Sequence, residues 1–215
     1  HRLSDGRWGK PWGMQPSTHI FKPGINRDFD ALDVIEHISM ETARKVGVPV
    51  PLSSVMTFGS RRAFVTARYD RLRRPDGSVA RIHQEDFCQA LGIAPEKKYS
   101  SKGGPTAADL LKMIHENSLN VESDESFFVR ALAVNVALRG TDAHAKNYAF
   151  LHTDAGVRLA PAYDIVSFLP YAEGTQLRGL KSAMGIGGQS RFTEIGEANW
   201  VNLAQSAGVD PDKVL

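Results

Sequence analysis

The chain is poor in cysteine: Cys88 is the only one among 215 residues. A single thiol cannot form an internal disulfide, which excludes the disulfide-stapled class of small secreted domain and fits a reducing compartment. Phe87 and Leu91 lie close to it in sequence. We therefore expect Cys88 to be buried as a small hydrophobic side chain rather than exposed as a reactive thiol.

Long hydrophobic runs are also missing. The longest nearly apolar run, Ala131–Leu138, is interrupted by Asn135, whereas a transmembrane helix needs about 20 apolar residues. The first residues, His1–Lys10, are polar and glycine-rich and lack the apolar core of a signal peptide. We expect no membrane contact and a cytoplasmic location.

Neither sign of charge dominates, because 26 basic side chains face 24 acidic ones and leave a net charge of +2. Such a balance lacks the bulk positive charge of a protein that coats nucleic acid, so the charge names no partner. Hydrophobic residues make up 42% and charged residues 23% of the chain. These fractions are typical of a globular protein and disfavour disordered, collagen-like and coiled-coil classes.

The length of 215 residues predicts one domain of two lobes or two small domains, since a typical domain has roughly 150 residues. The chain begins with His1 instead of a methionine and stops at Leu215, just after Asp210-Pro211-Asp212. We expect from these ends that the chain is a piece of a longer protein.

Residues 1–70 predict a small α+β lobe. Turn signals in the first 25 residues leave room for a short strand at His19–Lys22. From Phe29 to Val46 apolar residues recur every three to four positions, which indicates one amphipathic helix. Two β-rich runs follow, Ser54–Phe58 and Ala63–Tyr69, with a connection of hairpin length.

Residues 71–215 predict a mainly helical lobe. The arginine-rich segment Leu72–Arg81 is expected to be a solvated loop, and Gly103-Gly104-Pro105 either reverses the chain or approaches a ligand. Thr106 and Asp109 have the spacing of a capping box. The expected helices are Gln84–Leu91, Thr106–Asn117, Glu125–Leu138 and Glu194–Ala207.

The segment after the third of these helices carries the most information about function. Asp142 and Asn147 have the D-x-x-x-x-N spacing with which phosphotransferases place a carboxylate near the acceptor hydroxyl and an amide oxygen on Mg²⁺. A β-hairpin over residues 148–159 is expected next, followed by Asp164, a second hard oxygen ligand for Mg²⁺. The order of these parts is that of a kinase catalytic lobe.

Other interpretations of the same residues are possible. Asp142 could cap a turn, Asn147 could start the hairpin in a left-handed conformation, and Asp164 could lie on the surface. His144 could bind zinc with Asp142 or Asp164, but the Asp142-x-His144 motif includes no second His or Cys, and a zinc site needs three or four such ligands. The ordered context favours catalysis over all of these.

A nucleotide also needs a cation for its phosphates and a pocket for its base. Lys22, at the end of the first strand, is the candidate cation, and Glu36 in the following helix is the acid expected to orient it; Glu41 is expected to face water. The adenine is expected at the lobe junction around Arg68-Tyr69-Asp70, with Tyr69 covering the ring. Asp70 either binds ribose or caps a turn.

Several motifs, in order along the chain, resemble the HipA toxin family, and the resemblance covers about Trp8 to Gly188. The motifs are Thr18-His19-Ile20-Phe21-Lys22-Pro23, Ala43-Arg44-Lys45-Val46-Gly47-Val48, Ala67-Arg68-Tyr69-Asp70-Arg71, Gln84-Glu85-Asp86-Phe87-Cys88-Gln89, Gly103-Gly104-Pro105, Thr141-Asp142-Ala143-His144-Ala145-Lys146-Asn147 and Ala162-Tyr163-Asp164-Ile165.

The resemblance implies an ATP- and Mg²⁺-dependent serine/threonine protein kinase with a two-lobed, α+β, protein-kinase-like fold, the toxin of a bacterial type II toxin–antitoxin system. Lys22 resembles the family's phosphate-binding lysine, Asp142 its catalytic aspartate, and Asn147 and Asp164 its Mg²⁺ ligands. His144 resembles a further phosphate contact. The implied partners are a protein substrate, in some members an aminoacyl-tRNA synthetase, and a small HipB-like antitoxin through which alone the complex contacts DNA.

One part of the family pattern is missing from this sequence. The mobile phosphate loop, which carries an autophosphorylated serine, precedes the Thr-His-Ile-x-Lys strand in the family; Ser4 and Ser17 have no matching context here. No phosphosite is therefore carried over. A small-molecule or lipid kinase and a non-catalytic scaffold that binds an antitoxin remain alternatives to the protein kinase.

Overall fold

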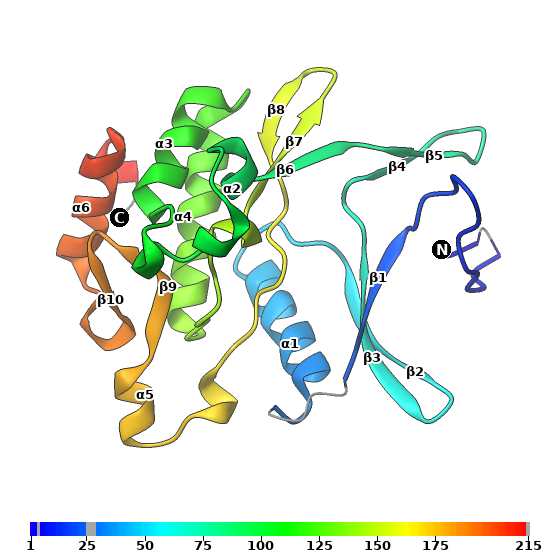
Figure 1. The fold of residues 1–215 in the computed structure, drawn as a ribbon, viewed down its shortest axis with the longest axis horizontal. Helices are drawn as coiled ribbons and strands as arrows, with labels where there is room; N and C mark the ends of the chain where they lie inside the picture. The colour runs from blue at the N-terminus through cyan, green and yellow to red at the C-terminus, as the bar shows by residue number, and fades with distance from the viewer. Residues whose placement is uncertain (4, 25–28, 214–215) are drawn as a thin grey trace.

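The computed structural model describes residues 1–3, 5–24 and 29–213, and Ser4 therefore lies outside the described residues. Figure 1 shows a β-rich lobe that carries the N-terminus and a helical lobe that carries the C-terminus, with helix α1 (Leu32–Lys45) lying against the sheet of the first lobe. No helix in the described ranges is both long and apolar enough to span a bilayer.

The small lobe is built on a three-stranded antiparallel sheet in the order β1-β3-β2. Its strands are β1 (His19–Pro23), β2 (Ser53–Phe58) and β3 (Arg61–Ala67), close to the predicted ranges. The register places Lys22 of β1 opposite Phe64 of β3. Lys22 thus lies on an edge strand that is paired with the central strand β3, in which Ala63, Phe64, Val65 and Thr66 are buried.

Helix α1 forms where the apolar spacing predicts a helix, but its buried face differs from the predicted stripe, because Ile38 and Val46 are exposed and two acids are buried. Met40 and Ala43 pack into the core, and Asp33 and Glu36 are buried beside them. Burying a carboxylate is costly unless a cation pairs with it, and Arg62 donates two hydrogen bonds, of 2.5 and 2.9 Å, to Asp33. The partner of Glu36 belongs to the site described below.

Two predictions for the middle of the chain are corrected. The segment 72–81 is a short hairpin rather than an unstructured loop, with β4 (Arg71–Arg73) paired to β5 (Val79–Arg81). The helix predicted over Gln84–Leu91 is wrong in its first part, because β6 (His83–Asp86) pairs with β7 (Ala149–Thr153) and only α2 (Phe87–Ala90) is helical.

The physical reason for the second correction is the cap of α2. The side chain of Asp86 accepts a hydrogen bond of 3.1 Å from the backbone N–H of Gln89, and the Gln89 side chain accepts one of 3.0 Å from the N–H of Asp86. This capping box begins the helix at Phe87. The preceding backbone groups are then available to the sheet formed by β6, β7 (Ala149–Thr153) and β8 (Gly156–Leu159).

The helical lobe packs α3 (Ala107–Asn117) between α4 (Val121–Ala137) and α6 (Glu197–Ala207). The Thr106–Asp109 capping box is confirmed. Helix α4 starts one turn before the predicted range, and most of its length is buried, as predicted. The lobe is completed by α5 (Thr175–Gly179), β9 (Lys181–Ile186) and β10 (Gln189–Arg191). Short 3-10 turns lie at Pro95–Lys97, Ser100–Lys102, Ala145–Asn147, Leu169–Tyr171, Phe192–Glu194 and Pro211–Lys213.

The core is shared by elements from both halves of the chain. Phe64 of the small lobe, Phe128 of α4 and Met184 of β9 belong to one cluster of buried apolar side chains. Cys88 is free and buried in the same cluster, which confirms its prediction as a small hydrophobic residue.

We expect Gly140→Ala to destabilise this fold. An added Cβ would lie 2.5 Å from Oδ1 of Asn135, and Asn135 is buried and held by hydrogen bonds to Ala131 and Tyr148. Overpacking of this kind costs about 1–3 kcal/mol, so the midpoint of thermal unfolding should fall. Gly179→Ala is the matched control because an added Cβ there meets nothing within 4 Å. Equal midpoints for the two variants would contradict the expectation.

Candidate active site

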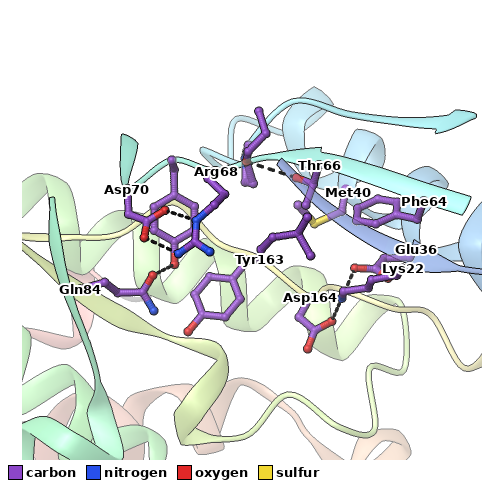
Figure 2. Close-up of a pocket in the computed structure, with 14 residues that line it drawn as sticks. Lys22, Glu36, Met40, Phe64, Thr66, Arg68, Asp70, Gln84, Tyr163 and Asp164 are labelled. Atoms are coloured by element: carbon purple, nitrogen blue, oxygen red, sulfur yellow. Dashed lines mark hydrogen bonds and ion pairs between the residues drawn. The ribbon is translucent and has the colours of Figure 1, made fainter. Parts of the chain in front are cut away.

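A cavity of about 250 Å³ lies beside the small-lobe sheet and is closed from the other side by the segment around Tyr163 and Asp164. Figure 2 shows two polar groups of side chains at opposite ends of it. Phe64 and Met40 are among the buried apolar residues that line the space between them. The complete lining is Ile20, Lys22, Glu36, Met40, Pro51, Phe64, Thr66, Ala67, Arg68, Tyr69, Asp70, Gln84, Tyr163 and Asp164.

One end of the cavity is organised by Lys22. Its ammonium group donates a hydrogen bond of 2.6 Å to Oε1 of Glu36 and forms an ion pair with Oδ1 of Asp164. Figure 2 shows this chain of three side chains, which come from β1, α1 and the segment after β8. The structure therefore brings Lys22 together with Glu36, the acid predicted to orient it. Glu41 pairs with Arg44 away from the cavity.

Burial and charge act on these groups in opposite directions. Burial works against the charge of Lys22, but Asp164 and Glu36 outweigh it and raise the Lys22 pKa. Glu36 is only 4% exposed, and burial raises its pKa to about 7 although the Lys22 ammonium opposes the shift. Lys22 thus stays cationic at neutral pH, whereas Glu36 titrates there.

We expect Glu36→Gln to change how stability depends on pH. The unfolded Glu ionises near its ordinary pKa of 4.5 and the folded one at about 7, so between these values the folded state holds a proton that the unfolded state has lost. The stabilising contribution of this group is full below pH 4.5 and falls as the pH rises to about 7. Denaturant unfolding across this interval should show the native protein losing stability relative to Glu36→Gln. Parallel curves would contradict the raised pKa.

Asp164 and Asn147 lie in contact. The side-chain amide of Asn147 donates a hydrogen bond of 3.0 Å to Oδ2 of Asp164, and its Oδ1 accepts one of 3.2 Å from the N–H of His144. Asp164 has a φ of 61°, a left-handed conformation that Asp tolerates better than most residues and that often marks a functional position.

The chemistry of these donors fits Mg²⁺. A carboxylate and an amide oxygen are hard ligands, and Mg²⁺ in kinases takes one or two such protein ligands and completes its shell with water and phosphate oxygens. The described residues contain no group of three His, Cys, Asp or Glu side chains that could hold a metal ion by themselves. The pair therefore suits a metal that arrives with a phosphate, and does not suit a structural zinc ion.

Asp142 lies in the loop after α4. The loop is held by the backbone of Asn135, whose carbonyl accepts a hydrogen bond of 2.8 Å from the N–H of Gly140. The Asp142 side chain is 68% exposed, and Asp142 and Asp164 line the same small hollow. Oδ1 of Asp142 accepts a hydrogen bond of 2.6 Å from the hydroxyl of Tyr99.

His144 is buried between these groups. Its Nε2 lies 3.8 Å from Oδ2 of Asp142, and its Nδ1 has no hydrogen-bond partner among the described residues. Burial lowers the pKa of His144, opposed by the charge of Asp142. The ring nitrogen that faces Asp142 is therefore Nε2, whereas the unpaired Nδ1 is buried.

Arg68, Tyr69 and Asp70 form the other end of the cavity. Arg68 donates hydrogen bonds of 2.9 and 2.6 Å to the two oxygens of Asp70, and Arg71 donates one of 2.8 Å. Asp70 is thus buried and paired with the guanidinium groups of Arg68 and Arg71. The Tyr69 hydroxyl donates a hydrogen bond of 2.5 Å to Oε1 of Gln84.

Three residues of the site were missed by the sequence analysis. Tyr163 lines the cavity, stacks at 5.7 Å between ring centres on Tyr69, and donates a hydrogen bond of 2.7 Å to the carbonyl of Lys146. The sequence feature that could have identified Tyr163 is its position directly before Asp164, a predicted Mg²⁺ ligand. Gln84 falls in a range with a helical pattern and Tyr99 in no recognised motif, so neither carries a sequence signal that points to the site.

Comparison with known proteins gives the family. Residues 6–215 match the family described as HipA-like C-terminal domain. The chain belongs to this family.

Two relatives of this HipA-like chain show the extent of the match. The protein named "Putative kinase Y4mE" of Sinorhizobium fredii is 38% identical, over 96% of this chain and 48% of its own length. The "Serine/threonine-protein kinase toxin HipA" of Shewanella oneidensis is 31% identical, over 75% of this chain and 39% of its own length. This chain therefore spans less than half the length of either. The kinase names support a phosphotransferase at the family level.

Solved structures confirm the α+β kinase-like fold. HipA in the Shewanella oneidensis MR-1 complex of HipA, HipB and operator DNA superposes with a TM-score of 0.79 at 27% identity, over 92% of this chain and 47% of that one. The Helicobacter pylori proinflammatory kinase CtkA gives a TM-score of 0.59 at 13% identity, over 91% and 76%. The second likeness supports the fold alone.

Proposed function

We propose that the protein is an ATP- and Mg²⁺-dependent serine/threonine protein kinase whose active site is the cavity between Lys22 and Tyr69. The observation that carries the proposal is the convergence of a lysine, a buried glutamate and an aspartate at one end of this cavity, next to Asp142. Kinases position nucleotide phosphates with such a lysine–glutamate pair and hold the metal with an aspartate and an asparagine.

Each side chain has a role in this proposal. Lys22 binds phosphate oxygens and is oriented by Glu36, and Asn147 and Asp164 hold Mg²⁺, which neutralises charge on the phosphates. Asp142 accepts the hydrogen bond of the acceptor hydroxyl and takes its proton as the hydroxyl oxygen bonds to the γ-phosphorus and the bond from that phosphorus to the leaving ADP breaks. Catalysis then rests on positioning and on charge stabilisation.

The rest of the nucleotide is assigned to the other residues of the cavity. The backbone around Arg68, Tyr69 and Asp70 binds the adenine, and Tyr69 covers its ring. His144, whose Nε2 lies 3.8 Å from Oδ2 of Asp142, contacts a phosphate, as the family resemblance implies. This division places the nucleotide lobe at residues 1–70 and the catalytic lobe at 71–215.

The proposed biological role is that of a toxin in a HipA/HipB-like system. The relative named as a kinase toxin and the solved HipA–HipB–DNA complex support it. The substrate would be a cellular protein such as an aminoacyl-tRNA synthetase, whose phosphorylation arrests growth. A small HipB-like antitoxin would neutralise the protein and carry any contact with DNA, and the pair would act in the cytoplasm.

Labelled ATP tests this function. The complete gene product, incubated with a cell lysate and labelled ATP, should transfer phosphate to serine or threonine of one or a few proteins, identified by mass spectrometry. Label in a metabolite or lipid and in no protein would favour a small-molecule kinase. Failure to bind Mg·ATP with retained binding of an antitoxin would favour a scaffold, and either result would contradict the proposal.

A further inference from the structure

The loop formed by residues 97–105 packs against the loop that carries Asp142. The Tyr99 hydroxyl donates its hydrogen bond of 2.6 Å to Asp142 Oδ1 across 43 residues of sequence. The backbone N–H of Ala145 donates a hydrogen bond of 3.3 Å to the carbonyl of Lys98. Tyr99 and Asp142 thus lie on two loops whose backbones are hydrogen-bonded to each other.

The backbone of the 97–105 loop is tightly fixed. The carbonyl of Tyr99 accepts hydrogen bonds from the N–H groups of Lys102, at 3.0 Å, and Gly104, at 3.1 Å. The Ser100 hydroxyl ties the loop to the carbonyl of Ala183 in β9 at 3.0 Å. A Cβ on Gly104 would lie 1.8 Å from the carbonyl oxygen of Lys97, so this turn requires glycine. Tyr99 is therefore presented by a rigid support.

The Tyr99 ring is also fixed by its neighbours. It packs edge-on against His144 with 5.2 Å between ring centres, and the Lys98 and Lys102 ammonium groups lie 5.0 and 5.4 Å from its centre. The hydrogen bond to Asp142 raises the pKa of Tyr99 to about 12. At neutral pH the phenol keeps its proton and can only donate that proton to Asp142.

We propose that Tyr99 is a positioning residue for Asp142, an inference that rests on the proposed kinase function. By holding Oδ1, Tyr99 fixes the plane of the carboxylate and leaves Oδ2 for the acceptor hydroxyl. The geometry favours this over a blocking role, because the Asp142 side chain remains 68% exposed and its Oδ2 lies 3.8 Å from Nε2 of His144, whereas the hydroxyl of Tyr99 is bonded to Oδ1.

Tyr99→Phe tests the proposal because it keeps the ring against His144 and removes only the hydroxyl. Misplacing a catalytic group costs up to about 100-fold in rate, so kcat should fall by about 10- to 100-fold. KM for ATP and the midpoint of thermal unfolding should stay unchanged, because water can replace the hydroxyl at the exposed carboxylate of Asp142. Tyr171→Phe is the matched control. It removes a hydroxyl that donates to the carbonyl of Asp30, outside the cavity, and should leave kcat unchanged.

The outcomes separate this proposal from the function it rests on. An inactive native protein would contradict the kinase function itself. An active native protein with an equally active Tyr99→Phe would overturn the positioning role alone, and a faster Tyr99→Phe would mean that the hydroxyl occupies the acceptor's place. Crystal structures supply a readout without activity: Asp142 should have one side-chain orientation in the native protein and several in Tyr99→Phe. One unchanged orientation in both would overturn the proposal.

Discussion

Asp142→Asn is expected to lower phosphate transfer by about 10²- to 10⁴-fold, the usual contribution of a general base, while ATP binding is retained. The amide cannot take the proton of the acceptor hydroxyl. Because Asp142 is exposed and lies outside the nucleotide cavity, its replacement leaves the contacts of Lys22 and Asp164 in place. Transfer of labelled phosphate and calorimetric ATP binding, measured on the same preparation, check the two halves of this prediction.

The control for this variant is Asp154→Asn, an exposed aspartate in the turn between β7 and β8. It makes the same chemical change outside the site and should leave transfer unchanged. Full transfer activity in Asp142→Asn would remove Asp142 from the mechanism. Loss of ATP binding in that variant would show instead that the loop after α4 had been disrupted.

Asp164→Asn is expected to weaken Mg²⁺-dependent ATP binding by about 10- to 100-fold, the range typical of a disturbed metal site. Asparagine suits this position because, like aspartate, it tolerates the φ of 61°. The substitution removes the charge that pairs with Lys22 and would bind the metal. Calorimetric titration with ATP, in the presence of Mg²⁺ and in EDTA, measures the effect.

The comparison between the two titrations is decisive for Asp164. In EDTA the variant should bind ATP at least as well as the native protein, because one negative charge near the phosphates is gone. An equal gain from Mg²⁺ in both proteins would exclude Asp164 as a metal ligand.

Much of the fold follows from local sequence patterns. The Thr106–Asp109 box and the spacing of apolar residues in α1 are properties of a few neighbouring residues, and both structures form as predicted. Gln84–Asp86 became a strand because its backbone pairs with β7 more than 60 residues away, and helical propensity carries no information about such a partner. The hairpin β4–β5 could not be predicted because its side chains are mostly polar and lack the alternating apolar pattern of a strand. Its two strands are held together by backbone pairing.

The candidate site also contains residues that the sequence predicts and contacts that it does not. Lys22, Asp142, Asn147 and Asp164 stand at recognisable places in the order of strands, helices and loops, so they could be chosen from sequence. Glu36 could be chosen because it lies beside the apolar stripe of its helix. Contacts that join distant segments could not be predicted: the hydrogen bonds from Tyr69 to Gln84 and from Tyr99 to Asp142 depend on tertiary packing.

In the proposed function the cavity binds Mg·ATP with the phosphates directed toward Asp142. A crystal structure of the complete gene product with Mg²⁺ and a non-hydrolysable ATP analogue tests it most directly. The nucleotide should bind with its adenine beside Tyr69 and its phosphate oxygens on Lys22, and the metal should contact Asn147 and Asp164. A nucleotide bound elsewhere, or a metal that touches neither Asn147 nor Asp164, would contradict it.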